Sequence, residues 1–227
     1  MDTARQEARR GAKEGTVIIA GEQTGGRGRL KRTWLSPPGN VALSIVLYPD
    51  IAGLPYLVMI ASLAVVHSIE TITGLKTQIK WPNDILIGGK KVCGILIENE
   101  LTGNRVAHAI IGIGINVDLK AADFADISTT ATSLNEESDS VVSRTKIIRS
   151  ILTEFERLYL ALPAGETIYK AWRDRLATLG KRVRVKSGDR TLEGTAEAVD
   201  ESGALMLRHS DGTSTRVIAG DVNLREE

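Results

Sequence analysis

The sequence predicts an α+β protein in which a mixed β-sheet with flanking helices is followed by a small β-barrel. Three observations support this class. The chain has 227 residues, of which 42% are hydrophobic and 25% charged, as in ordinary globular domains. Strand-like and helix-like segments alternate as far as Gly180. Beyond Gly180 the segments become short and strand-like, with turn signals between them. We therefore expect one domain over residues 1–179 and a second over 180–227.

The first half of the chain predicts one short helix, one long helix and the strands of the sheet. Alanines four residues apart within 2–14 indicate a short amphipathic helix. Residues 41–49 are almost continuously apolar, as expected of a strand covered on both faces. Residues 54–74 are long enough for a buried helix that ends at a glycine. We expect further strands over 16–22, 77–81, 84–100 and 106–117, the third folded into a hairpin at Gly88-Gly89.

The second half predicts two amphipathic helices and then the β-module. Apolar residues recur with a helical period from Ile147 to Leu162. A second helix is expected over residues 166–179, ended by Gly180. Four or five short strands then follow, separated by turn pairs at Ser187-Gly188, Ser202-Gly203 and Asp211-Gly212. This pattern predicts a small antiparallel barrel.

Composition argues against several classes of function. The net charge is +1, whereas a nucleic-acid-binding domain usually carries a clear basic excess. The single cysteine, Cys93, allows no internal disulfide, and the three histidines are scattered without zinc-binding spacing. The apolar segment 54–66 is too short for a membrane span, and residues 2–14 are too polar for a signal peptide. We expect a cytoplasmic protein without a nucleic-acid or membrane partner.

The stretch GGRGRLKRTW, residues 25–34, is the most unusual segment of the chain. Three glycines and four cations fall within it, beside Trp34. Glycines free the backbone and cations attract anions, so the segment is suited to wrap a negatively charged ligand. Taken alone, it fits an RNA-binding patch, a phosphate-binding loop of an enzyme or a solvated surface loop.

Three further motifs stand out, and each has an ordinary structural interpretation. They are KWPND at residues 80–84, GGKKVCGILIE at 88–98 and GIGINV at 112–117. A lysine at a strand end is usually solvated, and lysines beside a hairpin turn protect a sheet edge. Glycines inside a strand indicate a bulge or a close backbone approach. None of these motifs alone identifies a function.

Together and in this order, the four motifs resemble those of biotin–protein ligases. The family's G-R-G-R-x-G-R-x-W is matched at residues 26–34, and its K-W-P-N-D is complete at 80–84. Its basic-x-x-G-I-L segment is matched at 91–96 and its G-x-G-I-N at 112–116. The resemblance covers nearly the whole chain. It implies a class II synthetase-like catalytic domain of the biotin/lipoate ligase type and an SH3-like C-terminal domain.

The resemblance also implies an activity. Biotin would be activated by ATP, with Mg²⁺, to biotinyl-5′-AMP and then transferred to a lysine of the biotin carboxyl carrier domain of a carboxylase. The enzyme is expected to be monofunctional, because the chain shows no N-terminal helix-turn-helix segment. Pairing of the strand at 106–117 between subunits would give a homodimer, although nothing in the sequence requires one.

The resemblance assigns the candidate site residues. Catalysis would fall to Lys80, Arg27 and Arg29, with Lys80 in the leading role because an ammonium stabilises the α-phosphate. Biotin would contact Gln23, Gly26, Arg27, Gly28, Arg29, Lys80, Gly94 and Gly112. ATP and the adenylate would contact Arg29, Arg32, Trp34, Lys80, Asn83, Lys91 and Asn116, and Asp84 would hold the metal. We expect the loop at 25–34 to be mobile in the empty site and to close over the ligand.

The sequence departs from the family pattern in two places. Lys31 stands at a glycine position of the loop, which costs about 1 kcal/mol if that position needs a positive φ. The family's first strand and a Ser-Thr pair that helps hold biotin would precede Met1. We therefore expect weakened biotin binding by this 227-residue form.

Three alternatives remain open from the sequence. The first is a lipoate–protein ligase-like enzyme, which a comparison of thermal stabilisation by biotin and by lipoate would separate. The second is a non-catalytic biotin or nucleotide binder, which would bind ligand without transferring it. The third is an RNA-binding module, which predicts a steep salt dependence of RNA affinity.

Overall fold

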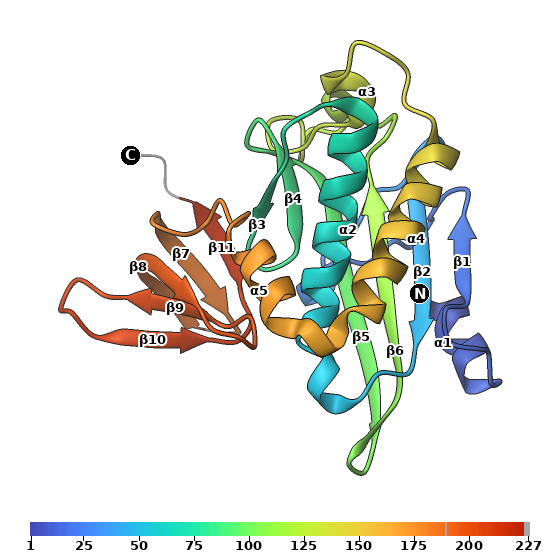
Figure 1. The fold of residues 1–227 in the computed structure, drawn as a ribbon. Coiled ribbons are helices and arrows are strands. Elements are labelled where there is room, and N and C mark those ends of the chain that lie inside the picture. Colours follow the sequence, from blue (N-terminus) through green and yellow to red (C-terminus); the bar gives the residue numbers. More distant parts are fainter. Residues whose placement is uncertain (189, 225–227) are drawn as a thin grey trace.

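The computed structural model describes residues 1–188 and 190–224, which form two β-sheets and five α-helices (Figure 1). The larger sheet has six strands in the order β1-β2-β6-β5-β4-β3, and the smaller has five in the order β10-β9-β8-β7-β11. The paired strands run antiparallel, and parallel pairing enters through bridges such as Ile79–Leu176 and Lys91–Ala131. The predicted α+β fold with a mixed sheet and a second β-module is confirmed.

The elements follow the predicted order closely. The strands of the larger sheet are β1 (Val17–Ala20), β2 (Val41–Leu47), β3 (Gln78–Lys80), β4 (Asp84–Ile87), β5 (Lys90–Thr102) and β6 (Arg105–Ile115). The strands of the smaller sheet are β7 (Arg182–Ser187), β8 (Arg190–Val199), β9 (Leu205–Arg208), β10 (Ser214–Val217) and β11 (Asp221–Leu224). The helices are α1 (Asp2–Arg9), α2 (Tyr56–Thr73), α3 (Leu134–Glu137), α4 (Arg144–Leu160) and α5 (Gly165–Arg173).

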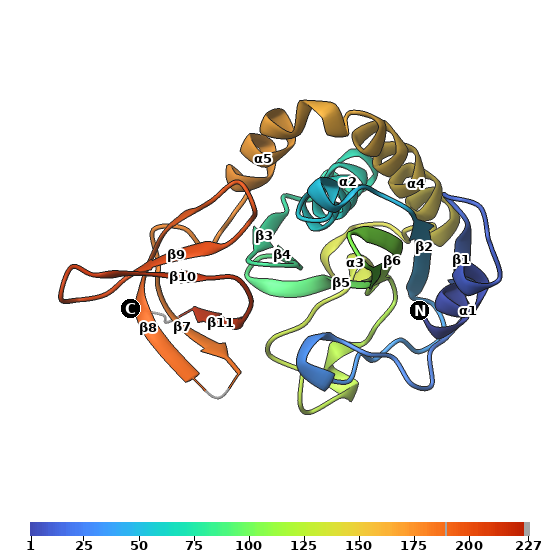
Figure 2. The ribbon, with the colours of Figure 1, turned by 90° about the horizontal axis from the view of Figure 1, so that it is seen from below.

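Helices α2 and α4 cover one face of the larger sheet (Figure 2). The core of the protein lies between these helices and the sheet, and includes the fully buried Ile60, Ile111 and Ile147. On the opposite face, α1 packs Ala4 and Ala8 against β2 and β6 in a separate small cluster. The rest of that opposite face is left for the segment at residues 25–34.

Helix α2 is the central helix of the core. By length and composition it is the one described helix that would suffice to cross a membrane, but 61% of it is buried inside the fold. It ends at Gly74, which adopts φ 71° and donates its backbone N–H to the carbonyl of Glu70. This left-handed ending is the one that the glycine predicted.

Two predictions about the sheet and the last helix are wrong. The strand at 106–117 is not an edge strand, because β6 lies between β2 and β5 and both its edges are used within the chain. Helix α5 ends at Arg173 rather than near residue 179. The chain beyond it pairs instead with β3, where the backbone N–H of Ala177 donates to the carbonyl of Ile79 at 2.8 Å. An unpaired sheet edge offers backbone hydrogen bonds that override a weak helical pattern.

The C-terminal module docks on the K-W-P-N-D motif. Trp81 is 1% exposed, and its indole Nε1 donates to the backbone carbonyl of Gly203 at 2.8 Å. The backbone N–H of Trp81 donates to the hydroxyl of Thr178, in the segment that leads into the module. Tyr169 of α5 adds a hydrogen bond to the carbonyl of Val199. These contacts fix the module beside the site-bearing face of the larger sheet.

Candidate functional site

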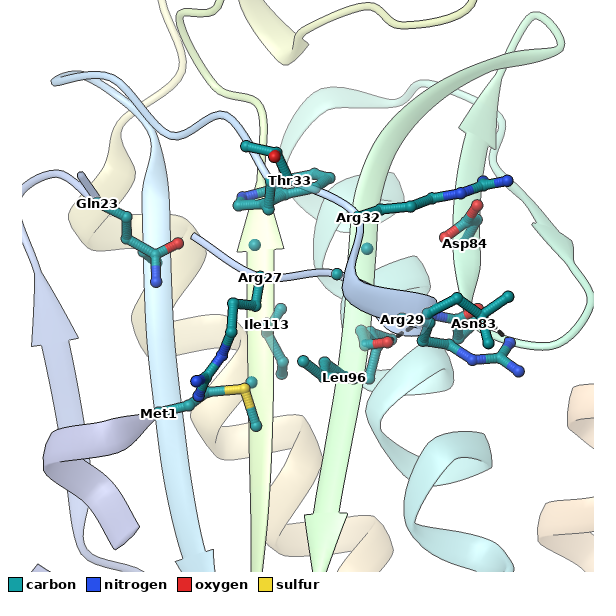
Figure 3. A pocket seen from close by; sticks show the side chains of 18 of the residues that line it. Met1, Gln23, Arg27, Arg29, Arg32, Thr33, Asn83, Asp84, Leu96 and Ile113 are labelled. Atoms are coloured by element: carbon teal, nitrogen blue, oxygen red, sulfur yellow. Dashed lines mark hydrogen bonds between the residues drawn. The ribbon is translucent and has the colours of Figure 1, made fainter. Parts of the chain in front are cut away.

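A pocket lies between the segment at residues 25–34, which we call the cationic loop, and the face of the sheet opposite α2 (Figure 3). Its floor is formed by two rows of residues that run across β2, β6 and β5. One row is Ala42, Gly114 and Gly94, and the other is Ser44, Gly112 and Leu96. Three of these six floor residues are glycines and two more are alanine and serine, so the strands present mostly backbone and small side chains to the pocket.

The glycines of the floor make room for Trp34. A Cβ at Gly114 would lie 2.5 Å from two atoms of the Trp34 ring, and one at Gly94 would lie 3.2 Å from the same ring. The tryptophan therefore rests directly on the strands, which is the close approach that glycines inside a strand indicate. Its indole Nε1 is buried without a hydrogen-bond partner among the described residues. An unsatisfied buried donor is costly, so this N–H suits a ligand acceptor.

The cationic loop is an irregular hairpin. The N–H of Trp34 donates to the carbonyl of Gly26 at 2.9 Å, and that of Gly28 donates to the carbonyl of Arg32 at 2.7 Å. Gly26 is required, because a Cβ there would lie 2.3 Å from the carbonyl oxygen of Trp34. The left-handed residue of the loop is Leu30, with φ 54°, whereas the side chain of Lys31 lies outside the described residues. The prediction that the empty loop is mobile stays a prediction.

Among the cations of the loop whose side chains the structure describes, Arg29 is the most enclosed. Its Nη1 donates to Oδ1 of Asn83 at 3.1 Å, and Nδ2 of Asn83 donates to the carbonyl of Ile95 (Figure 3). The second hydrogen bond fixes the orientation of the amide, so that its oxygen faces the guanidinium. Burial lowers the pKa of Arg29 from its ordinary value, while the charges of Asp84 and Asp221 oppose that shift. The buried guanidinium stays charged, because its ordinary pKa is so high.

Arg27 lies at the mouth of the pocket and is half-exposed. Its Nη2 is 2.6 Å from Oδ1 of Asp2 and 3.7 Å from Oε1 of Glu98. The hydrogen bond with Asp2 raises the pKa of Arg27 and lowers that of Asp2. Because both acids are on the surface, this pairing is weak enough for an anionic ligand to compete for the guanidinium.

Lys91 places its ammonium inside the pocket. Its Nζ is 2.7 Å from Oδ1 of Asp84 and 5.4 Å from the centroid of the Trp34 ring. A cation over an indole face is stabilised by the ring quadrupole. Lys91 also lies against Gly94, so a positive charge is held directly over the glycine floor.

The pocket gathers most of the predicted site residues. Its lining includes Gln23, Arg27, Gly28, Arg29, Arg32, Trp34, Asn83, Asp84, Lys91, Gly94 and Gly112. Three candidates are absent from the described lining, namely Gly26, Lys80 and Asn116. Gly26 supports the backbone of Trp34, and the amide of buried Asn116 donates to the carbonyl of Thr132 at 3.0 Å. Lys80 lies on β3, the outermost strand on its side of the sheet. The described lining therefore includes Lys91 but not Lys80. Lys80 pairs with the lining residue Asp84 across β3 and β4, and its catalytic role stays a prediction.

Sequence reasoning missed several lining residues. Gly114 was visible as the second glycine of β6, two residues from Gly112, and therefore on the same face of the strand. The side chain of Met1 lies against Gly112, with its Sδ 2.7 Å from where a Cβ would stand. Gly220 and Asp221 of the C-terminal module also line the pocket. No local pattern marked that pair.

The pocket offers little to a metal ion on its own. The described residues contain no group of three or more His, Cys, Asp or Glu side chains that would hold one. The acids in the lining are Asp84 and Asp221, which pair with Lys91 and Arg32 respectively. Magnesium is commonly held by one or two carboxylates together with substrate phosphates, and Asp84 fits that arrangement.

Cations gathered over a bare patch of sheet suit an enzyme that brings two anionic reactants together, and the two-sheet fold places the chain among the protein ligases. Residues 3–116 match the biotin/lipoate A/B protein ligase family, and residues 178–225 match the biotin protein ligase C terminal domain. The chain belongs to the biotin/lipoate A/B protein ligase family.

Named relatives and solved structures agree with this family. The bifunctional ligase/repressor BirA of Bacillus spizizenii is 40% identical over 228 residues, covering 98% of this chain and 70% of the relative. The biotin–[acetyl-CoA-carboxylase] ligase of Paracoccus denitrificans is 34% identical, covering 86% and 85%. The biotin protein ligase of Aquifex aeolicus, solved with biotin and ATP, superposes with a TM-score of 0.82 at 27% identity, covering 99% of this chain and 95% of that one.

Proposed function

We propose that this chain is an ATP-dependent biotin–protein ligase that joins biotin to a lysine of the biotin carboxyl carrier domain of a carboxylase. The observation that carries the proposal is the convergence of Arg27, Arg29 and Lys91 on a glycine floor. The relative from Paracoccus denitrificans is named for this ligation, and the solved Aquifex aeolicus relative holds biotin and ATP. We assign adenylation to residues 1–179 and a supporting role to residues 180–227.

The first step joins two anions. A carboxylate oxygen of biotin attacks the α-phosphorus of ATP, and the bond from that phosphorus to the bridging oxygen of the β-phosphate breaks. Pyrophosphate leaves with the electron pair, and biotinyl-5′-AMP remains. Cations must offset the repulsion between the reactants and the charge that develops on the phosphorus oxygens. Arg29 and Lys91 are held in place for this by Asn83 and Asp84.

Lys80 and Lys91 share the leading catalytic role in this proposal. Lys80 opens the K-W-P-N-D motif and pairs with the lining residue Asp84 across β3 and β4, and Lys91 lines the pocket itself. Its position between Asp84 and the ring of Trp34 restricts the ammonium to the region above Gly94. A cation held in a fixed position lowers the barrier more than a mobile one, because it needs no reorganisation during the reaction.

The second step transfers the biotinyl group. The neutral amine of the carrier lysine attacks the acyl carbon of biotinyl-AMP, the bond from that carbon to the phosphate oxygen breaks, and AMP leaves. The amine nitrogen then loses a proton, which leaves an amide. Water would hydrolyse the same anhydride, so the adenylate must be shielded while the carrier binds. Trp34 and the cationic loop lie over the floor and are placed to provide that shield.

Several parts of the proposal rest on the family resemblance. Mg²⁺ would be held by Asp84 with the nucleotide phosphates, and it would neutralise charge on the leaving pyrophosphate. The adenylate would extend toward Arg32, with biotin nearer Gln23 and Gly112. We expect the enzyme to act in the cytoplasm, without a nucleic-acid partner, and we leave its oligomeric state to measurement.

The test is a transfer assay with two lysine variants. The chain is incubated with ATP, Mg²⁺, biotin and a carrier domain, and mass spectrometry follows the gain of one biotinyl group on the carrier. Lys80→Ala and Lys91→Ala should each lower kcat by a factor of about 10²–10³, the usual cost of removing one fixed transition-state donor. Lys90→Ala, at the exposed neighbour of Lys91 outside the described lining, is the matched control and should leave kcat unchanged.

The outcomes separate the parts of the proposal. No transfer by the unmodified chain would refute the function. A loss of less than about tenfold in either lysine variant would remove that lysine from the catalytic role. Lipoic acid in place of biotin, in the same assay, distinguishes the two ligase activities of the family.

A further inference from the structure

We propose that Asp221 of the C-terminal module is a positioning residue for adenylation, which acts by holding Arg32 and thereby the cationic loop over the pocket. Asp221 opens strand β11 and forms an ion pair with Arg32 across 189 residues of sequence. Both residues line the pocket. The inference rests on the proposed function, because it assigns the module a part in that reaction.

The carboxylate of Asp221 is presented by a rigid element. Asp221 pairs with Lys186 in the antiparallel ladder between β11 and β7. The preceding Gly220 is packed so tightly that a Cβ would lie 2.6 Å from Cγ1 of Val185 and 3.1 Å from the carbonyl oxygen of Lys186. The side chain of Asp221 is 23% exposed, whereas that of Arg32 is 64% exposed. A mostly buried acid on a strand therefore meets an exposed arginine on a loop, so the acid sets the position.

The contact acts on more of the loop than Arg32 alone. The carbonyl of Arg32 accepts the hydrogen bond from the N–H of Gly28, so the two sides of the loop tip are joined. The tip between them carries Arg29, whose charged form the nearby Asp221 also favours. Tethering the side chain of Arg32 therefore restrains the segment that presents Arg29 to the pocket.

The sign of the effect separates positioning from simple electrostatics. A carboxylate beside a polyphosphate pocket repels ATP. If the charge of Asp221 were its only influence, Asp221→Asn would tighten ATP binding. If Asp221 positions Arg32, the same substitution loosens the loop and weakens ATP binding. The two mechanisms predict opposite changes in KM for ATP.

The experiment measures biotinyl-AMP formation at varied ATP concentrations. Asp221→Asn should raise KM for ATP about threefold to fivefold, the factor expected for a partly exposed ion pair, with kcat changed less than twofold. Asp221→Glu, which keeps the charge, should restore most of the affinity. Glu197→Gln is the matched control, because Glu197 forms an ion pair with Arg208 in the same module and does not line the pocket. It should leave KM unchanged.

A double-variant cycle tests whether Asp221 acts through Arg32. In an Arg32→Ala background, Asp221→Asn should cause no further rise in KM for ATP. An unchanged or lower KM in the single variant, or an equal rise with and without Arg32, overturns the proposal.

A ligand-free measurement keeps the inference separate from the proposed activity. Trypsin should cut within the loop at residues 25–34 about threefold faster in Asp221→Asn than in the unmodified chain, since an exposed ion pair contributes that much restraint. Glu197→Gln should be cut at the unmodified rate. Equal cleavage of all three proteins overturns the inference, whereas an inactive unmodified chain refutes the proposed function without affecting the cleavage result.

Discussion

The two faces of the larger sheet use alternate residues of the same strands for opposite purposes. In β6, Ile111, Ile113 and Ile115 point toward α2 and α4 and are at most 2% exposed. Gly112 and Gly114 alternate with these isoleucines, lie on the face toward the cationic loop and carry no side chain. Isoleucine side chains fill the core face, and glycines leave the site face open for the pocket.

This contrast shows how a single strand encodes both stability and function. Because side chains alternate across a strand, the two patterns are interleaved in sequence without competing for positions. The registers with β2 and β5 repeat the arrangement, with Ile45 and Ile97 opposite Ile111 on the core face. On the site face, Ala42 and Gly94 lie opposite Gly114. Substitutions on the two faces should therefore affect different measurements.

The largest effect is expected from filling the emptied face. Gly114→Val places a side chain where even a Cβ would lie 2.5 Å from the ring of Trp34, so the ring must leave the floor. Biotinyl-AMP formation should fall by a factor of about 100 or more, as expected when groups in a catalytic site are displaced by about 1 Å. Far-UV circular dichroism should show the fold retained. Activity within threefold of the unmodified chain would contradict the interpretation of the floor.

The opposite experiment empties the filled face. Ile111→Ala leaves a cavity beneath α2 at a residue that is 0% exposed, and should lower the free energy of unfolding by about 2–5 kcal/mol. Urea denaturation measures the loss. At a temperature where the variant stays folded, its kcat should remain within about threefold, since the side chain lies on the face of the sheet opposite the pocket. A large loss of kcat in the folded variant would show that the two faces are not independent.

The smallest expected effect concerns the contact between α2 and the segment that follows α5. Burial opposes the charge of Glu70, but hydrogen bonds from Arg175 and Thr77 outweigh it, so the pKa of Glu70 lies below its ordinary value of 4.5. Ionised Glu70 therefore stabilises the fold above that pH, and the contribution is lost as the pH falls through the lowered pKa. Glu70→Gln should cost about 1 kcal/mol or less at pH 7.

The pH dependence provides the control for that prediction. Thermal unfolding at pH 7 should separate Glu70→Gln from the unmodified chain, and the difference should shrink as the pH drops below about 4.5, the ordinary pKa of glutamate. Glu166→Gln is the control variant, because it removes an exposed acid that pairs with Lys170 within one helix. Its effect on thermal unfolding should be much smaller than that of Glu70→Gln, whose contacts join different segments. A difference that grows toward acid pH would contradict the role assigned to Glu70.

The sequence predicted the elements well because each has a local cause. The apolar run of α2, the glycine at residue 74 and the hairpin glycines at Gly88-Gly89 act within a few residues. The cationic loop and the floor glycines were also visible, the first by composition and Gly112 by its place inside a strand. Their joint meaning came from the spacing of four motifs in order, which led to the family that the comparisons then established.

The rest of the site depends on long-range geometry. Lys80 and Lys91 look alike in sequence, and their places relative to the pocket follow only from how β3, β4 and β5 pair. The ion pair between Arg32 and Asp221 joins residues 189 positions apart, and no local sequence pattern near either residue predicts it. The early end of α5 depends on a sheet edge that forms elsewhere in the chain. Such features follow from tertiary contacts rather than from local propensity.

The hydrogen bond from Trp81 to Gly203 determines what a C-terminal module from a relative would need in order to replace the one in this chain. The acceptor is a backbone carbonyl in a turn where Gly203 has φ 81°, and a Cβ there would lie 3.2 Å from Met59. A transplanted module would dock if its turn had the right shape, whatever side chains surrounded it. It would still need an acid at the place of Asp221 to meet Arg32. A chimera built on this chain would therefore have to match one turn and one carboxylate before overall sequence identity mattered.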